Sequence, residues 1–383
     1  MDQAKQVELL KESLSHTKGK EPYMSSEEKL IPVSKYTEEA VLEKEKECLF
    51  FNEMNVIGFS NEISSPGDFI TRDVMGAPVL ITRDKDGTAK AFLNVCRHRG
   101  ATIERKPKGN CKRFVCPYHA WTYRTDGSLA SVRHKQGFPT LDLENTSLKQ
   151  LPCEEAAGLL WVCPNPEKLG MSLTTETLQI AAELEALGCD DSIPFAQSTQ
   201  IWNANWKLIV DGGLESYHFR VAHSDTIGSF FGDNTSTFEV VGEHIRSVLP
   251  RLSLLDLEEK DTSEWNIRDH THLLYSLYPN ASILVQERHF ELILMTPLAV
   301  DQTRIDLITA ARRPESGELS QKAQDYLNAN HAFTKKTLDE DFVLAEEIQA
   351  GMHTGANDFF RLARFEGALT QWHELIDAKL EQA

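Results

Sequence analysis

Two short loops of the sequence each offer one thiolate and one imidazole. Cys96 and His98 lie two residues apart, Cys116 and His119 lie three apart, and 17 residues separate the two pairs. A structural zinc site usually takes two cysteines from one loop and a like pair of histidines or cysteines from the next. Loops that each mix one cysteine with one histidine instead suit a two-iron, two-sulfide cluster with two cysteines on one iron and two histidines on the other. Zinc, or Cys and His that are simply buried, is the alternative.

A second group of possible ligands lies further along the chain. At about 100° per residue, Asp211, Glu215 and His218 fall on one face of a helix, and His223 follows. Carboxylates that face inward lose solvation unless they bind metal, pair or hydrogen-bond, so this face indicates a polar site. His218 and His223 are five residues apart, and we expect the helix to end or distort between them. A solvated acidic helix face is the alternative.

Together the two groups resemble the alpha subunits of the Rieske non-haem iron oxygenases. Residues 96–100 and 116–121 match the cluster motif of that family, and residues 205–223 resemble its mononuclear iron motif. The resemblance covers roughly residues 35 to 355. It implies a Rieske [2Fe–2S] cluster held by Cys96, His98, Cys116 and His119. It also implies a mononuclear Fe(II) ion bound by His218, His223 and one carboxylate, a set that leaves coordination positions open for oxygen.

The third iron ligand is expected among three consecutive acidic residues of a C-terminal helix. Asp341 lies on the apolar face of this helix with Leu338, whereas Asp339 and Glu340 point to other sides. The family pattern agrees, because its aspartate ligand precedes a Glu-x-Gln-x-Gly run, here residues 347–351. We therefore predict Asp341 as the ligand, with Asp339 as the alternative.

The resemblance also assigns a role to Glu215, three residues before His218. It would connect His218 to His119 of the partner subunit and so provide a path for one electron. Most members of the family have aspartate here, and glutamate is similar to the subgroup that acts on quaternary amines such as carnitine. Asp211 stands where many relatives have asparagine and is a further candidate for the catalytic site.

These side chains need two different supports. Short β-branched segments between turn residues, from about residue 55 to 163, predict a small antiparallel β domain. Helices are expected near 175–187, after 205 and, as a long C-terminal helix, from about 321. Strands are expected near 238–247, 271–277, 281–286, 290–296 and 303–311. Together they predict a helix-grip domain, an antiparallel sheet covered by helices. We expect an α+β protein with a helical N-terminal arm at 1–45, a Rieske domain at 46–166 and a catalytic domain at 167–383.

Composition narrows the function classes. A chain of 383 residues with 41% hydrophobic and 26% charged residues is typical of folded globular domains. The formal net charge of −18 argues against nucleic acid and anionic membranes as partners. No apolar stretch is long enough to cross a bilayer, and no signal-peptide core precedes the first domain, so a cytoplasmic location is expected.

The function expected is that of the terminal oxygenase of a multicomponent system. The sequence has no GxGxxG fingerprint, so a separate NAD(P)H-dependent flavin/iron–sulfur reductase or a ferredoxin would supply the electrons. The leading prediction is mono- or dihydroxylation of a small, aromatic substrate by O2. The alternative is oxidative demethylation or C–N cleavage of a carnitine- or betaine-like amine, and a further alternative is an electron carrier without oxygenase activity.

The resemblance also implies a homotrimer, in which electrons cross from the cluster of one subunit to the iron of the next. Aromatic side chains that could line the substrate pocket come from several segments of the catalytic domain. The candidates are Trp202, Phe219, Phe230, Phe231, Trp265 and Tyr275.

Overall fold

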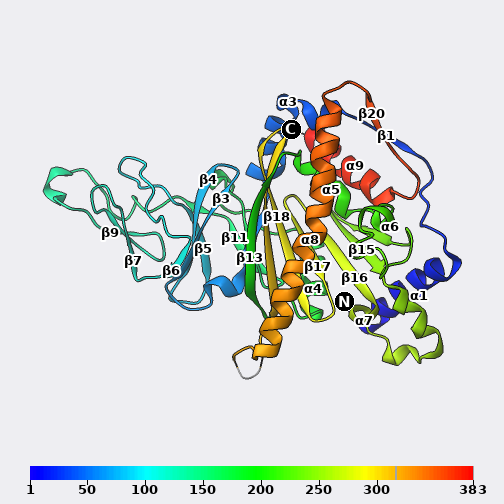
Figure 1. Cartoon of the computed structure of the whole chain (residues 1–383). Helices are drawn as coiled ribbons and strands as arrows, with labels where there is room; N and C mark the ends of the chain where they lie inside the picture. The colour runs from blue at the N-terminus through cyan, green and yellow to red at the C-terminus, as the bar shows by residue number, and fades with distance from the viewer. Residues whose placement is uncertain (315–316, 383) are drawn as a thin grey trace. The chain divides into compact units, whose positions relative to one another are not determined.

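The computed structural model describes residues 1–314 and 317–382. The chain forms two compact units, one of Glu47–Leu173 and the other of Met1–Lys46 together with Thr174–Ala383 (Figure 1). Both units contain antiparallel sheets, and the α-helices found among the described residues all lie in the larger unit. This architecture confirms the predicted α+β class. None of the helices in the described ranges is both long and apolar enough to span a membrane.

The smaller unit is built on a five-stranded antiparallel sheet of order β10-β5-β4-β3-β6. Its other sheets, of three strands each, have the orders β11-β12-β2 and β7-β8-β9. The strands of this unit are β2 (Asn55–Phe59), β3 (Asp68–Val74), β4 (Ala77–Arg83), β5 (Ala89–Leu93), β6 (Lys108–Asn110), β7 (Arg113–Val115), β8 (Thr122–Arg124), β9 (Leu129–Ser131), β10 (Gln150–Leu151), β11 (Cys153–Ala156) and β12 (Leu159–Val162).

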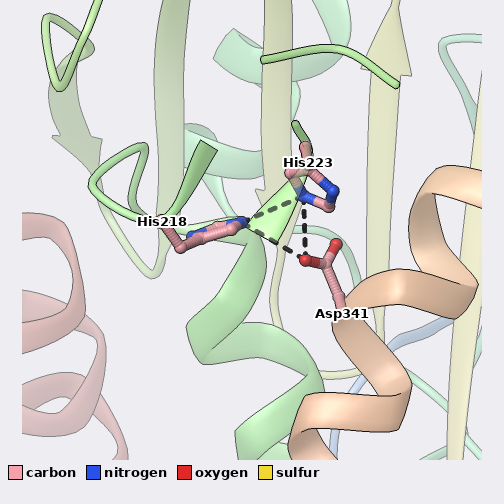
Figure 2. A group of neighbouring side chains, drawn as sticks. All are labelled: His218, His223 and Asp341. Carbon is pink, nitrogen blue, oxygen red and sulfur yellow. Dashed lines mark hydrogen bonds and ion pairs between the residues drawn. The ribbon is translucent and has the colours of Figure 1, made fainter. Parts of the chain in front are cut away.

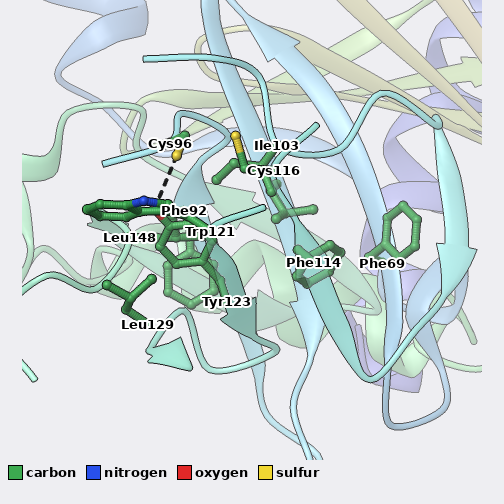
Figure 3. Packing of buried hydrophobic residues seen from close by; sticks show 11 residues of the cluster. Phe69, Phe92, Cys96, Ile103, Phe114, Cys116, Trp121, Tyr123, Leu129 and Leu148 are labelled. Carbon is green, nitrogen blue, oxygen red and sulfur yellow. Dashed lines mark hydrogen bonds between the residues drawn. The ribbon is translucent and has the colours of Figure 1, made fainter. Parts of the chain in front are cut away.

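The two faces of the five-stranded sheet bury two different cores. Side chains alternate between faces along a strand, so Ile70 of β3 and Ile81 of β4 pack toward β2 and β12. Phe69 and Leu80 point the other way and pack in a cluster with Phe114, Trp121 and both predicted cysteine ligands (Figure 3). The second core therefore supports the two loops expected to bind the cluster.

The larger unit contains a seven-stranded antiparallel sheet of order β13-β19-β18-β17-β16-β15-β14. From β14 to β19 each strand pairs with the next, and β13 pairs with β19 and forms one edge of the sheet. The strands are β13 (Ser192–Trp202), β14 (Thr237–Val241), β15 (His244–Pro250), β16 (Thr271–Leu277), β17 (Ala281–Val285), β18 (His289–Ala299) and β19 (Gln302–Arg312).

Helices cover this sheet. The long α8 crosses one face next to β13, β19 and α5 (Figure 1), whereas α4 contacts β14 and β15. The predicted helix-grip arrangement is confirmed. The helices are α1 (Gln3–Gly19), α2 (Ser34–Thr37), α3 (Glu39–Glu45), α4 (Thr175–Ala186), α5 (Trp206–Gly213), α6 (Phe219–Ala222), α7 (Ile267–His270), α8 (Gln321–Met352) and α9 (Gly367–Glu381).

The first 46 residues belong to the larger unit, which differs from the separate arm expected for 1–45. Leu9 and Leu10 of α1 are buried. The strand β1 (Lys29–Pro32) pairs antiparallel with β20 (Phe359–Leu362), a segment more than 300 residues away. The contacts that hold the N-terminal segment are thus long-range, and local sequence patterns do not report them.

Candidate active site and metal centres

The two Cys-His loops of the smaller unit have the same backbone geometry. In the first, the N–H of Cys96 donates to the carbonyl of Ala101 at 2.9 Å, and the N–H of Gly100 donates back to Cys96 at 2.9 Å. In the second, Cys116 bonds to Trp121 at 2.8 Å, and the N–H of the residue four after Cys116 donates back to its carbonyl at 3.0 Å. Each loop turns through a positive φ four residues after its cysteine, +76° in the first and +59° in the second.

These loops bring the four predicted cluster ligands together. Cys96 and Cys116 are buried in the core of Figure 3, and the Nδ1 atoms of His98 and His119 face each other at 3.1 Å. The ring of His98 stacks on Trp121 with centroids 4.9 Å apart. Two thiolates and two imidazoles with inward-facing nitrogens are the donor set of a Rieske cluster, so the residues suit that group.

The hydroxyl of Tyr123 contacts the first loop. It accepts a hydrogen bond from the N–H of Arg97 at 3.0 Å and lies 3.4 Å from the Sγ of Cys96. Burial and the hydrogen bond to Cys96 raise the pKa of Tyr123, so the phenol stays protonated and can donate to sulfur. A hydrogen bond to a cluster sulfur is one of the levers that set the reduction potential.

In the larger unit, His218, His223 and Asp341 converge on one point (Figure 2). The Nε2 atoms of His218 and His223 are 3.2 Å apart. The Oδ1 of Asp341 lies 3.3 Å from Nε2 of His218 and 2.9 Å from Nε2 of His223. Three donor atoms that face one another, two from imidazoles and one from a carboxylate, match the facial triad that binds Fe(II).

The charges of this triad also suit a cation. Burial lowers the pKa of His218, but the hydrogen bonds to Asp341 and Glu215 outweigh it and raise the value to about 10. Burial raises the pKa of Asp341, but the two histidines outweigh it and lower the net value. The carboxylates therefore favour positive charge at this point, and a divalent ion would replace the protons that the histidines carry without it.

The local helix differs from the expected one. We predicted one helical face with Asp211, Glu215 and His218, but α5 ends at Gly213 and α6 begins only at Phe219. The continuous face was therefore wrong, because α5 stops before His218. The helix also ends between the two histidines, as expected, since α6 stops at Ala222. Consecutive glycines at 212 and 213 have low helix propensity, which explains where α5 stops.

Each histidine of the triad pairs with a carboxylate through Nδ1, the ring nitrogen that faces away from the triad. The Nδ1 of His218 pairs with Oε1 of Glu215, and Oε2 of Glu215 accepts the backbone N–H of His218 at 3.2 Å. The Nδ1 of His223 pairs with Oε2 of Glu340 at 2.8 Å, and that oxygen also accepts the Thr226 hydroxyl at 2.6 Å. A carboxylate on Nδ1 fixes the tautomer and leaves Nε2 free to bind metal.

Glu340 is a residue that sequence reasoning missed. We expected it to point away from Asp341, yet both side chains reach His223 because that histidine lies between them. Asp339, the alternative ligand, lies elsewhere: its Oδ1 accepts from Gln200 at 2.9 Å and its Oδ2 from Lys335 at 2.6 Å. The structure thus brings Asp341 and not Asp339 to the histidines.

Asp211 lies in a buried network rather than on the triad. Its Oδ2 accepts from the hydroxyl of Tyr36 at 2.7 Å, and its Oδ1 lies 3.0 Å from Nε2 of His373. The Tyr36 hydroxyl and the same nitrogen of His373 are 3.0 Å apart. Tyr36 and His373 come from opposite ends of the chain, so no local pattern could have indicated them. Asp211 still lines a cavity with Glu215 and Asp341.

A largely apolar cavity of about 130 Å³ opens onto the triad between the sheet and α8. His223 and Asp341 form part of its wall. Of the aromatic candidates, Phe219 and Phe231 line it, and Phe230 lines a neighbouring cavity. Trp202, Trp265 and Tyr275 line neither. Instead, Trp202 packs on Phe342, the indole of Trp265 donates a hydrogen bond to the carbonyl of Lys260, and Tyr275 donates one to Glu183.

The comparison with known families agrees with this geometry. The model described as the ring hydroxylating alpha subunit (catalytic domain) matches residues 183–382. The chain belongs to the ring-hydroxylating alpha subunit family. A second model, the Rieske [2Fe-2S] domain, matches residues 53–150. The resemblance stated from the sequence is confirmed, and this alpha subunit carries both the domain of the Rieske cluster and the domain of the mononuclear iron.

Individual proteins similar to this chain share a minority of its residues. The alpha subunit is 38% identical over 191 residues to the carnitine monooxygenase oxygenase subunit of Acinetobacter baumannii, which is 49% of this chain and 51% of that protein. The matched region thus spans about half the length of this relative. It is 26% identical to the 2-halobenzoate 1,2-dioxygenase large subunit of Burkholderia cepacia over 377 residues, 86% of this chain and 78% of that one.

A crystal structure has the same fold at low sequence identity. A quaternary ammonium Rieske monooxygenase, solved with its substrate L-carnitine, superposes with a TM-score of 0.77 at 24% identity. The match covers 91% of this alpha subunit and 95% of the other chain.

Proposed function

We propose that this protein is the terminal oxygenase of a multicomponent Rieske system and oxidises a quaternary or methylated amine with O2. The observation that carries the proposal is the triad of His218, His223 and Asp341 at the wall of an apolar cavity. When bound, the mononuclear iron supplies oxygen activation, and the cluster supplies electrons one at a time. Cys96, His98, Cys116 and His119 would hold the cluster.

The side chains around the triad prepare it for this chemistry. Glu215 and Glu340 hold the Nδ1 protons of the two histidines, so that both Nε2 atoms present lone pairs at one point. The cavity wall is made mostly of aliphatic and phenylalanine side chains, which exclude water from the reacting atoms. A carrier that only passes electrons needs neither the triad nor the cavity, which argues against the electron-carrier alternative.

The relatives favour an amine over the aromatic substrate that we predicted first. The carnitine monooxygenase is the more similar of the two relatives by identity, and glutamate at position 215 agrees with it. In the cavity, Phe219, Phe231 and Phe333 offer ring faces on which a methylated ammonium group could bind by cation–π attraction.

Ring hydroxylation is the second candidate. A halobenzoate dioxygenase large subunit matches 86% of this chain. Phenylalanine rings also pack against an aromatic substrate in edge-to-face geometry, as Phe219 and Phe231 do with each other at 5.6 Å. The same cavity can therefore accept an aromatic ring.

We further propose that the protein works as a homotrimer with a separate NAD(P)H-dependent reductase or ferredoxin. In this arrangement Glu215 would connect His218 to His119 of the partner subunit. Support comes from apolar side chains that remain exposed near Glu215, since Val221 is 81% and Tyr217 57% accessible to solvent. A contact with the neighbouring subunit would cover these two side chains.

The test is a single turnover with chemically reduced, iron-replete protein. L-Carnitine, glycine betaine and 2-chlorobenzoate are each supplied with O2, and the products are analysed. Trimethylamine or formaldehyde would report C–N cleavage or demethylation, and a hydroxylated ring would report the second candidate. We expect an amine product, which Asp341→Ala abolishes. Failure of all three substrates to yield product would reject the proposal for these substrate classes.

A further inference from the structure

A second cavity adjoins the one at the triad. The two share five wall residues, among them Phe231, His272 and Gln286. The inner cavity reaches the triad, whereas the outer one is lined by Arg251 and by polar groups that include Ser253. A ligand longer than a single ring or ammonium group could therefore extend from the triad into the outer cavity.

Arg251 supplies the positive charge of this region. Among the described residues it is the only lysine or arginine that lines either cavity, and Asp341 is the only carboxylate. Arg251 follows β15 two residues after Leu249, so its side chain lies on the cavity face of the sheet. Asp341 thus lines only the inner cavity, and Arg251 lines only the outer one.

The guanidinium of Arg251 keeps most of its hydrogen-bonding capacity. Its Nη2 donates to Nε2 of His272 at 2.6 Å. Its Nη1 lies 3.9 Å from Glu287, beyond hydrogen-bond distance, and Glu287 has a closer partner in Arg288 at 3.0 Å. No other described residue accepts from the remaining N–H groups of Arg251, which therefore stay available for an anion.

His272 is held as a second donor. Because its Nε2 accepts from Arg251, the proton of the neutral ring lies on Nδ1, which has no partner among the described residues. Burial and the nearby guanidinium lower the pKa of His272 to about 3, so the ring stays neutral at physiological pH. The edge contact with Phe231, with centroids 5.0 Å apart, fixes the ring in the wall that the cavities share.

We propose that Arg251 and His272 form a subsite for the carboxylate of the substrate. This inference rests on the proposed function and narrows its substrate class to carboxylates whose other end reaches the triad. The planar guanidinium suits a carboxylate, because it can donate two parallel hydrogen bonds to it. An anion held at Arg251 in the outer cavity would set which atom of the substrate faces the iron.

Binding measurements on the anaerobic holoenzyme test the subsite without turnover. The probes are L-carnitine with its carboxamide and benzoate with benzamide, so that each pair differs only in the charged group. A charge-assisted contact should favour a carboxylate by about tenfold or more over its amide. We expect this preference in the wild type for at least one pair, its loss in Arg251→Gln, and partial retention in Arg251→Lys, which keeps the charge.

Arg288→Gln is the matched control, because it removes the same charge beside Glu287 and lines neither cavity. It should keep the wild-type preference. A wild-type ratio near one for both pairs would overturn the subsite, and so would a preference that survives in Arg251→Gln. The proposed function is judged separately: a protein with the carboxylate preference but without product in the turnover test keeps the subsite and loses the oxygenase.

Discussion

At the scale of residues, the triad depends on the carboxylates behind it. His218 and His223 each give one ring nitrogen to the site and the other to a glutamate, Glu215 or Glu340. The second glutamate holds Thr226 as well, which ties α8 to the segment after α6. These contacts fix the direction of each ring and keep a proton on Nδ1, so that a metal ion replaces only the protons on Nε2.

Glu340 is therefore expected to be a positioning residue for iron. Glu340→Gln removes the negative charge that holds the Nδ1 proton of His223, and iron affinity should fall by about 10- to 100-fold. Titration of Fe(II) into the metal-depleted protein measures the change, and the cluster spectrum should stay the same. Glu347→Gln, an exposed position on the same helix, is the control. Equal affinities in the two variants would show that Glu340 does not act through His223.

The candidate ligands that the structure brings together could be found in the sequence because they occur in short motifs. The two Cys-His loops and the inward side of Asp341 follow from spacing and periodicity alone. Glu340, Tyr36 and His373 could not be predicted, because their partners are 114 to 337 residues away. Side-chain length also mattered, since Glu340 reaches His223 from a position that helical periodicity alone places on another side.

At the scale of elements, α5 connects the N-terminal segment to the active site. The buried side chain of Glu45, at the end of α3, accepts from Nε1 of Trp206 at 2.8 Å and from Nζ of Lys207 at 2.6 Å. Lys207 is 1% exposed, and burial lowers its pKa even with Glu45 beside it. The ion pair holds the first turn of α5, whose far end leads to Glu215.

Removing one partner of this pair should destabilise the larger unit. Glu45→Ala leaves the ammonium of Lys207 buried without a counter-charge, which costs about 3–5 kcal/mol of unfolding free energy. Denaturant unfolding followed by tryptophan fluorescence measures it. The double variant Glu45→Leu with Lys207→Met removes both charges and should recover most of the loss. A single variant as stable as the wild type would contradict this role.

The sheet contains buried neutral histidines that make the protein sensitive to acid. His244 of β15 pairs with the hydroxyl of Thr177 at 2.8 Å and accepts the backbone N–H of Tyr278 at 3.1 Å. Burial lowers the pKa of His244 to about 4. The unfolded chain, with an ordinary histidine pKa of about 6.5, binds the proton first as the pH falls.

The contribution of neutral His244 to the unfolding free energy should therefore be fully present above about pH 6.5. It should fall by about 1.4 kcal/mol per pH unit as the pH decreases toward 4. His244→Gln should make the decline shallower by that amount, as measured by unfolding free energy between pH 4 and 7. His272, whose pKa is lowered further, adds a decline of the same sign in both proteins. Parallel pH profiles for the wild type and His244→Gln would contradict the assignment.

The elements themselves were predicted unevenly. Strands β16 to β19 and the helix α8 have strong periodicity and match the expected segments closely. The segment expected as one strand from 238 to 247 is the hairpin of β14 and β15, which turns at Gly242 with a φ of +59°. Strand β13 was missed, because it lies at the edge of the sheet and has a half-exposed polar sequence with Pro194.

At the scale of the whole molecule, the chain combines two compact units with two different sets of candidate iron ligands. The smaller unit offers two thiolates and two imidazoles, and the larger unit offers two imidazoles and one carboxylate. Neither set shares a residue with the other. We therefore expect that one site can be emptied while the other remains intact.

The measurement that tests this most directly is the iron and acid-labile sulfide content of the wild type and of Asp341→Ala, each with an electron paramagnetic resonance spectrum after reduction. The wild type should contain about three irons and two sulfides per chain with a Rieske-type signal, and the variant about two irons with the same signal. A variant that keeps about three irons, or an Fe(II)-treated wild type that holds only about two, would contradict the assignment of the triad as the mononuclear iron site.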